Sequence, residues 1–225
     1  TRTVGYFIPK TSAAAAAEAP AEATAVAAPA VAETAKSSFA ARTHTKALAN
    51  GLKLQVLPTP GTGIVGMSLQ FNAGGYFAPA EKPMVASFTS SLLTSGTSSM
   101  DARQISAAFE EMGSGIGFRS GNFYTSAGTK VAAVDFAQLM KMTADMLLNP
   151  SFPEKELATL KLRYAAHFKE AGSDPEAISD NELNHALYGA DSIYHDKSPK
   201  DCMVELGTIT RDDLVAYHKS AYTPK

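Results

Sequence analysis

Hydrophobic and polar residues alternate with a period of two in several short runs of the first half of the chain. The clearest run, over residues 64–73, places Val65, Met67, Leu69 and Phe71 on one face. This period is typical of a β-strand with one buried face. We expect strands over residues 52–57, 64–73, 116–120 and 123–131, with turns at Asn50-Gly51 and Gly121-Asn122.

Apolar residues in the second half recur instead with the spacing of a helix. The pattern predicts helices over residues 83–94, 102–112, 135–148, 153–171 and 175–188, and a last helix that ends at Ser220. Asp101 is expected to cap the second of these helices, and residues 209–213 contain a start similar to a capping box. Strands grouped early and helices grouped late predict an α+β fold, a mainly antiparallel sheet with helices packed on one face.

The N-terminal part of the chain differs in composition from the rest. Residues 13–35 are mostly alanine, interrupted by Pro20 and Pro29, and they carry no apolar stripe that would dock a helix on a core. We therefore interpret residues 13–42 as an extended linker and residues 43–225 as the folded domain. Residues 1–12 begin with a short strand-like segment.

Charge and composition exclude several classes of function. The net charge is −2 and charged residues make up 19% of the 225 residues, so no nucleic-acid partner or anionic membrane surface is indicated. No apolar run approaches the length of a membrane span, so we expect no membrane insertion. The single cysteine excludes an internal disulfide, and the spacing of His185, His195, Cys202 and His218 is unlike that of a compact zinc site.

The helix predicted over residues 83–94 carries the most informative pattern. Residues 83–97 read PMVASFTSSLLTSGT. This segment resembles the zinc-binding helix of the pitrilysin/insulinase metallopeptidases (family M16), G-L-A-H-F-L-E-H-M-L-F-x-G-T. The residues that match the frame are Ala86, Phe88, Leu93, Gly96 and Thr97. In this resemblance the two zinc-binding histidines fall on Ser87 and Ser91, and the catalytic glutamate falls on Ser90.

Serines at these positions cannot perform the chemistry of that motif. Residues 87 and 91 are four apart and lie one turn apart on one face of a helix, as two histidines that share a zinc ion would. A neutral hydroxyl is a poor zinc ligand and no general base near neutral pH. Two interpretations stay open: the serines form a small-residue face packed against the sheet, with hydroxyls bonded to helix carbonyls, or they line a peptide-binding surface.

Further segments extend the resemblance over most of residues 48–225. They include residues 50–53 (NGLK), 72–75 (NAGG), 109–114 (FEEMGS), 146–152 (MLLNPSF) and 209–214 (ITRDDL). The family's third zinc ligand is a glutamate on a later helix, and counting back from Asp174-Pro175 places it at His167. A single histidine would be a one-ligand site, so we interpret His167 as an ordinary helix residue and predict no metal, cofactor or catalytic residue in this chain.

The resemblance implies a non-catalytic M16 domain. Such domains help to enclose an unfolded peptide substrate, while zinc is held by an active M16 half or subunit, either in the same longer protein or in a partner. Residues 1–12 would then be the terminal strand of a preceding module. The alternatives are a purely structural subunit with the same fold, and a zinc metallopeptidase only as the full-length protein. Exported bacterial members with two halves make a periplasmic or cell-envelope location the expectation.

Overall fold

The computed structural model describes residues 38–222. Residues from Thr43 onwards form one compact unit, and Arg42 and the residues before it belong to another. The only regular element of that first unit within the described residues is a single helical turn, α1 (Phe39–Arg42), all of whose residues are exposed. The predicted strand-like segment at 1–12 and the alanine-rich residues 13–35 lie outside the described residues.

A three-stranded antiparallel sheet forms the centre of the compact unit. Its strands are β3 (Ile64–Phe71), β4 (Gly117–Ser120) and β5 (Thr125–Ala132), and β5 lies between the other two. Side chains alternate along each strand between a buried and an exposed face, as the period of two predicts. Two further strands, β1 (His44–Ala47) and β2 (Lys53–Val56), pair with each other as a separate hairpin.

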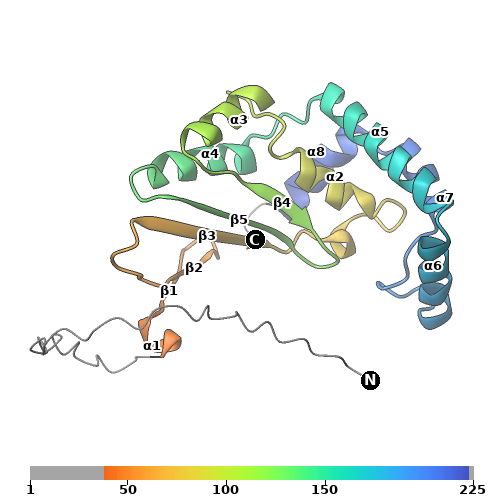
Figure 1. Cartoon of the computed structure of the whole chain (residues 1–225), viewed down its shortest axis with the longest axis horizontal. Coiled ribbons are helices and arrows are strands. Elements are labelled where there is room, and N and C mark those ends of the chain that lie inside the picture. The colour runs from red at the N-terminus through yellow and green to blue at the C-terminus, as the bar shows by residue number, and fades with distance from the viewer. Residues whose placement is uncertain (1–37, 223–225) are drawn as a thin grey trace, which may run out of the picture. The chain divides into compact units, whose positions relative to one another are not determined.

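Helices cover one face of the sheet, which confirms the predicted α+β class (Figure 1). In chain order the helical elements are the 3-10 turn η1 (Gly75–Phe77), α2 (Met84–Leu92), α3 (Ala102–Glu111), α4 (Phe136–Leu148), α5 (Glu154–Ala171), α6 (Pro175–Leu187), α7 (Pro199–Thr208) and α8 (Arg211–Ala221). None of the helices in the described part of the chain is long and apolar enough to cross a membrane.

Most predicted elements lie within two residues of their expected bounds, because their start signals are local. Asp101 accepts the backbone N–H of Gln104 and forms a full capping box, and Thr210 forms another with Asp213. The prediction omitted β1, α7 and the short turns α1 and η1. Helix α7 does carry a local signal, since the Ser198 hydroxyl accepts the N–H of Asp201 and Pro199 occupies the first helical position.

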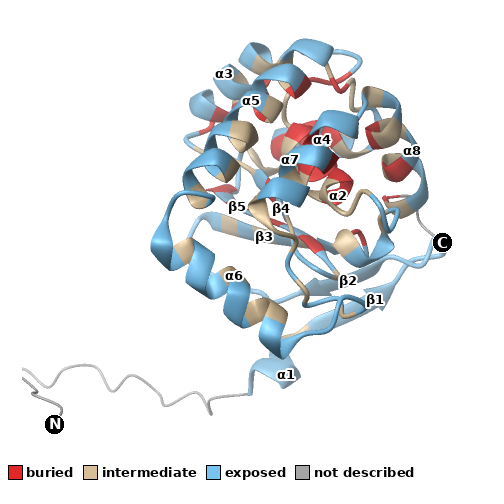
Figure 2. Cartoon of the chain, turned by 90° about the vertical axis from the view of Figure 1, so that its right-hand side faces the viewer, coloured by how far each residue is buried: buried red, intermediate tan, exposed pale blue. Residues whose placement is uncertain are grey.

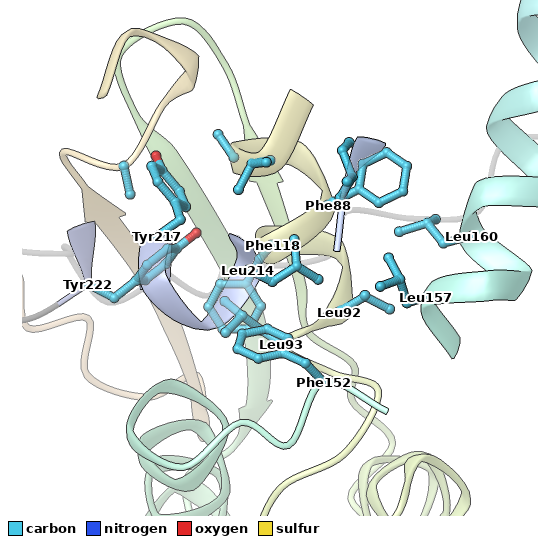
Figure 3. Close-up of a cluster of buried hydrophobic side chains, with 14 of the residues drawn as sticks. Phe88, Leu92, Leu93, Phe118, Phe152, Leu157, Leu160, Leu214, Tyr217 and Tyr222 are labelled. Atoms are coloured by element: carbon cyan, nitrogen blue, oxygen red, sulfur yellow. The ribbon is translucent and has the colours of Figure 1, made fainter. Parts of the chain in front are cut away.

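The hydrophobic core lies between the sheet and the helices. Its larger part joins α2 to α5, α8 and the covered face of the sheet, and its smaller part joins α3 and α4 to β5. Figure 2 shows buried residues concentrated on α2 and α4, whereas α6 is exposed or half-buried throughout. In Figure 3, Phe88 and Leu92 of α2 point toward Leu157 and Leu160 of α5. Helix α2 is therefore a central packing element.

The bend between β3 and η1 determines where α2 begins. A Cβ atom on Gly74 would lie 2.4 Å from the carbonyl oxygen of Asn122, so no other residue fits there without a backbone shift. The Tyr217 hydroxyl donates to the carbonyl of Gly74 at 2.9 Å, and the Thr125 hydroxyl donates to that of Ala73 at 2.6 Å. Burial raises the pKa of Tyr217, so this phenol stays a hydrogen-bond donor.

Candidate functional site

Helix α2, the segment that resembles a zinc-binding helix, is held on most of its surface by the core. Six of its nine residues are buried: Val85, Ala86, Phe88, Thr89, Ser90 and Leu92. The ring of Phe88 contacts that of Tyr164 on α5, with centroids 4.8 Å apart. Gly96, at φ +149°, follows the helix in a conformation that side chains rarely adopt. The framework residues of the motif are thus explained by packing.

A buried carboxylate anchors the first turn of α2. Glu205 of α7 is 4% exposed, and its Oε1 accepts the backbone N–H of Met84 at 2.7 Å. Its Oε2 pairs with Lys197 Nζ at 2.7 Å. A negative charge at a helix N-terminus is stabilising, because the first N–H groups of a helix point outward without partners. The sequence analysis missed Glu205, since its role depends on a contact 121 residues away along the chain.

A second ion pair joins the segment before α2 to α8. Lys82 Nζ lies 2.8 Å from Asp213 Oδ2 and donates to the Thr208 carbonyl at 3.0 Å. Burial raises the pKa of Asp213, but hydrogen bonds from Lys82 and Thr210 outweigh it and leave the pKa below its ordinary value of 3.8. The Asp213 carboxylate therefore stays charged near neutral pH and keeps its ion pair with Lys82.

The three serines occupy different environments on α2. Ser90 is 2% exposed, and its hydroxyl donates to the carbonyl of Ser87 at 2.9 Å. Ser87 and Ser91 are half-buried. Ser90 thus fits the interpretation of a packed serine bonded to a helix carbonyl. Ser87 and Ser91, four residues apart, retain the access to solvent that the second interpretation, a peptide-binding surface, requires.

His167, the counted position of the third ligand, lies on α5 and is exposed. Its ring lies 5.6 Å from that of the adjacent Phe168. About two turns of α5 pack into the core beside α2 through Leu157, Leu160 and Tyr164, and His167 lies one turn further along the same stripe, where it is exposed. The interpretation of His167 as an ordinary helix residue stays a prediction.

These four residues do not fit a zinc ion. Zinc sites in proteins use thiolate, imidazole or carboxylate donors, three or four at a time. Here the set contains three neutral hydroxyls, one of which is already bonded to a helix carbonyl, and one exposed imidazole. Across residues 38–222, no three His, Cys, Asp or Glu side chains are grouped closely enough to hold a metal ion. No chemical step is therefore assigned to zinc in this chain.

Of His185, His195, Cys202 and His218, the structure stacks two histidines together, and no group of three metal-binding side chains forms within the described residues. His185 of α6 stacks on His195 with ring centroids 4.4 Å apart. Each ring uses one nitrogen on a backbone carbonyl, His185 on Asp196 and His195 on Tyr188. His218 instead donates from α8 to the Leu147 carbonyl at 2.8 Å. Two parallel stacked rings do not aim their lone pairs at a common point, so the pair serves to hold the segment after α6 against that helix.

A shallow pocket of about 300 Å³ lies just beyond the C-terminal end of α2. It is lined by residues 95–101 together with Ser151 and Pro153, and does not include the serines of the motif. Between the last two residues, Phe152 is buried at φ +46°, a strained conformation for a side chain of this size. Arg211 holds it by donating to the carbonyls of Ser151 and Phe152. The pocket contains no pair of groups suited to acid–base catalysis.

Comparison with known proteins identifies the fold family. The profile of the insulinase family, Peptidase family M16, matches residues 56–195, which is more than half of the chain. This chain belongs to the M16 peptidase family. Among solved structures, it is similar to a peptidase M16 inactive domain from Pseudomonas fluorescens, with 26% identity and a TM-score of 0.70, over 78% of this chain and 42% of the other.

Two further proteins are similar over a comparable share of this chain. An uncharacterized zinc protease of Bacillus subtilis (strain 168), YmxG, is 24% identical over 175 residues, which is 78% of this chain and 42% of the relative. A protease from Helicobacter pylori shares the fold, with a TM-score of 0.70 and 17% identity over 81% of this chain and 44% of the other. The chain thus spans less than half the length of these relatives.

Proposed function

We propose that this chain is a non-catalytic M16 domain that helps to enclose an unfolded peptide for a zinc-dependent active half, in the same longer protein or in a partner subunit. The observation that carries the proposal is the contrast within α2. The helix is built into the core through Phe88, Leu92 and Glu205, yet its motif positions hold serines. The packing around α2 is intact, while its motif positions carry hydroxyls in place of metal ligands.

Two findings support this proposal. The structure of an M16 domain described as inactive, from Pseudomonas fluorescens, is similar to this chain at 26% identity. The uncovered face of the three-stranded sheet, opposite the helices, is exposed along all three strands and offers a wall for a polypeptide. A metallopeptidase activity would then belong to the complete protein, with zinc held outside this chain.

The test uses the complete protein and an unfolded peptide that carries a photoreactive residue. We expect ultraviolet cross-linking to attach the peptide to this chain, and cleavage to survive the triple change Ser87→Ala, Ser90→Ala and Ser91→Ala, because no serine takes part in the chemistry. Peptide cleavage by the complete protein without any cross-link to this chain would favour a purely structural role. Loss of cleavage in a correctly folded triple variant that still cross-links the peptide would show that the serines are catalytic.

A further inference from the structure

The face of the sheet that the helices leave uncovered has an unusual composition. We call the part of it beyond the exposed pair of Ile64 and Ala132 the open face, and it consists of Gly66, Ser68 and Gln70 of β3, Gly117 and Arg119 of β4, and Ser126, Gly128 and Lys130 of β5, all of them exposed. The strand register aligns them in three rows: Gly66 beside Lys130, then Ser68, Gly128 and Gly117, then Gln70, Ser126 and Arg119. The middle row therefore lies between two rows that each end in a cation.

The glycines of this face are not required by the fold. A Cβ atom added to Gly66 or Gly117 would meet no atom within 4 Å, and one on Gly128 would make an ordinary contact of 3.8 Å with the Met67 carbonyl. None of the three has a positive φ. Glycine inside a strand weakens it, and it often marks a place where another backbone approaches closely. The three glycines thus form a floor with room for a second polypeptide backbone.

The charges of the compact unit are divided between its two layers. Residues 43–80 and 112–134, which contain all five strands, hold four Lys or Arg residues and no Asp or Glu. Residues 81–111 and 135–222, which contain the helices from α2 onwards, hold 19 acidic and 11 basic residues. The net charge of −2 for the whole chain conceals this division. The sheet side attracts anions, and the helix side repels them.

The spacing of the two cations suits an extended chain. Lys130 and the row that contains Arg119 are four residues apart along β5, which corresponds to roughly 13 Å in a strand. In an extended peptide, side chains four residues apart lie on the same face at the same separation. Two carboxylates with this spacing match the two cations, while the peptide backbone crosses the glycine floor.

We propose that the open face selects acidic segments of an extended polypeptide, pairing Lys130 and Arg119 with carboxylates while the glycines receive the backbone. This inference rests on the proposed function, of which it specifies the substrate class. Nucleic acid fits less well, because its binding depends on many phosphate contacts along a continuous cationic track. The open face has two cations separated by uncharged residues.

The test is fluorescence anisotropy of the complete protein with labelled peptides of Ala, Ser and Gly about 12 residues long. One peptide has two glutamates four residues apart, and its match has glutamines there. We expect the glutamate peptide to bind about 3- to 10-fold more tightly at low salt, as two exposed ion pairs allow, and the advantage to fade as salt rises.

Two double variants locate the effect. Arg119→Gln with Lys130→Gln should remove the advantage of the glutamate peptide. Lys155→Gln with Arg163→Gln changes the net charge equally at two exposed positions of α5 and should leave the advantage intact. Gly117→Val, which adds bulk to the floor at a position with open space, should weaken the binding of both peptides.

The outcomes separate this inference from the proposed function. Equal binding of the two peptides, or an equal loss in both double variants, would refute the acidic preference and leave the enclosing role standing. Failure of the protein to bind either peptide would refute both. A single-stranded RNA oligonucleotide could instead bind more tightly than the glutamate peptide. If only the variant with Arg119→Gln and Lys130→Gln lost this RNA binding, the assignment to polypeptide would be overturned.

Discussion

The two faces of the three-stranded sheet are made by alternate residues of the same strands, yet different factors explain which residues they contain. On the covered face, Thr125, Ala127 and Val131 of β5 are buried beneath the helices. On the open face, Ser126, Gly128 and Lys130 of the same strand are exposed. The covered face is determined by packing. The open face contains three glycines and two cations that packing does not explain.

Helix α2 shows the same division on a smaller scale. Its buried side keeps the large residues that join it to α5, while Ser87 and Ser91 lie where solvent reaches them. We therefore expect stability and binding to depend on different residues of this fold. Substitutions on the buried side should lower the free energy of unfolding, and substitutions on the other side should change binding instead.

The largest effect is expected for Phe88→Ala on α2. The side chain is fully buried against Tyr164 and Leu160, so its removal should lower the free energy of unfolding by about 3–5 kcal/mol. The matched control is Tyr124→Ala, since Tyr124 is 50% exposed beside the open face and its removal should cost well under half as much. Urea denaturation measures both, and equal losses would contradict the division into two sides.

Glu205→Ala should have the next largest effect. Glu205 is 4% exposed, and its removal leaves the Met84 N–H without an acceptor and Lys197 without its counter-ion. We expect a loss of about 2–4 kcal/mol in the free energy of unfolding. Glu205→Gln keeps an acceptor for the Met84 N–H and removes only the charge, so its loss should be smaller. If both variants were as stable as the parent, the carboxylate would not anchor α2.

Rebuilding the motif should destabilise the chain without creating an enzyme. The combination of Ser87→His, Ser90→Glu, Ser91→His and His167→Glu restores the ligand types. Ser90 is only 2% exposed, however, so larger side chains there should cost about 1–3 kcal/mol through overpacking. Zinc ligands also need surrounding hydrogen-bond partners to orient them. We expect no chelator-sensitive cleavage of a quenched fluorescent peptide, and robust cleavage would show that only the ligands are missing.

The smallest effect concerns pH and His218. Burial lowers the pKa of His218 below its ordinary value of 6.5, because the ring is stacked on Tyr222 and packed against Phe152. As pH falls through 6.5 the unfolded chain binds a proton that the folded chain refuses, so the free energy of unfolding should decrease until the lowered pKa is passed. His218→Gln should flatten this part of the stability profile. If the slope were unchanged in this variant, the pH dependence of the free energy of unfolding would come from other groups.

The sequence predicted the elements with local signals and missed those that depend on distant contacts. The alternation in β3 and the capping boxes at Asp101 and Thr210 act within a few residues, and the structure confirms them. Strand β1 was missed because its residues are all exposed and show no buried face, whereas its partner β2 follows the predicted turn at Asn50-Gly51. The role of Glu205 and the open face depend on strands and helices that meet only in the folded chain.

In the candidate site, too, local patterns could be predicted and effects of distant contacts could not. The positions of Ser87, Ser90 and Ser91 came from the resemblance of residues 83–97 to a known helix, and α2 forms there. Their different burial could not be predicted, because it depends on how α5 and the sheet cover the helix. His167 was located by counting along the chain, and its exposure on α5 became visible only in the structure.

The most direct test of the central claim is the zinc content of this chain, produced without a histidine tag and measured by atomic emission after dialysis against a zinc-buffered solution. The account predicts no stoichiometric zinc, because the motif positions of α2 and α5 offer three hydroxyls and one exposed imidazole. One zinc ion per chain that is lost on Ser87→Ala, Ser91→Ala or His167→Ala would contradict it.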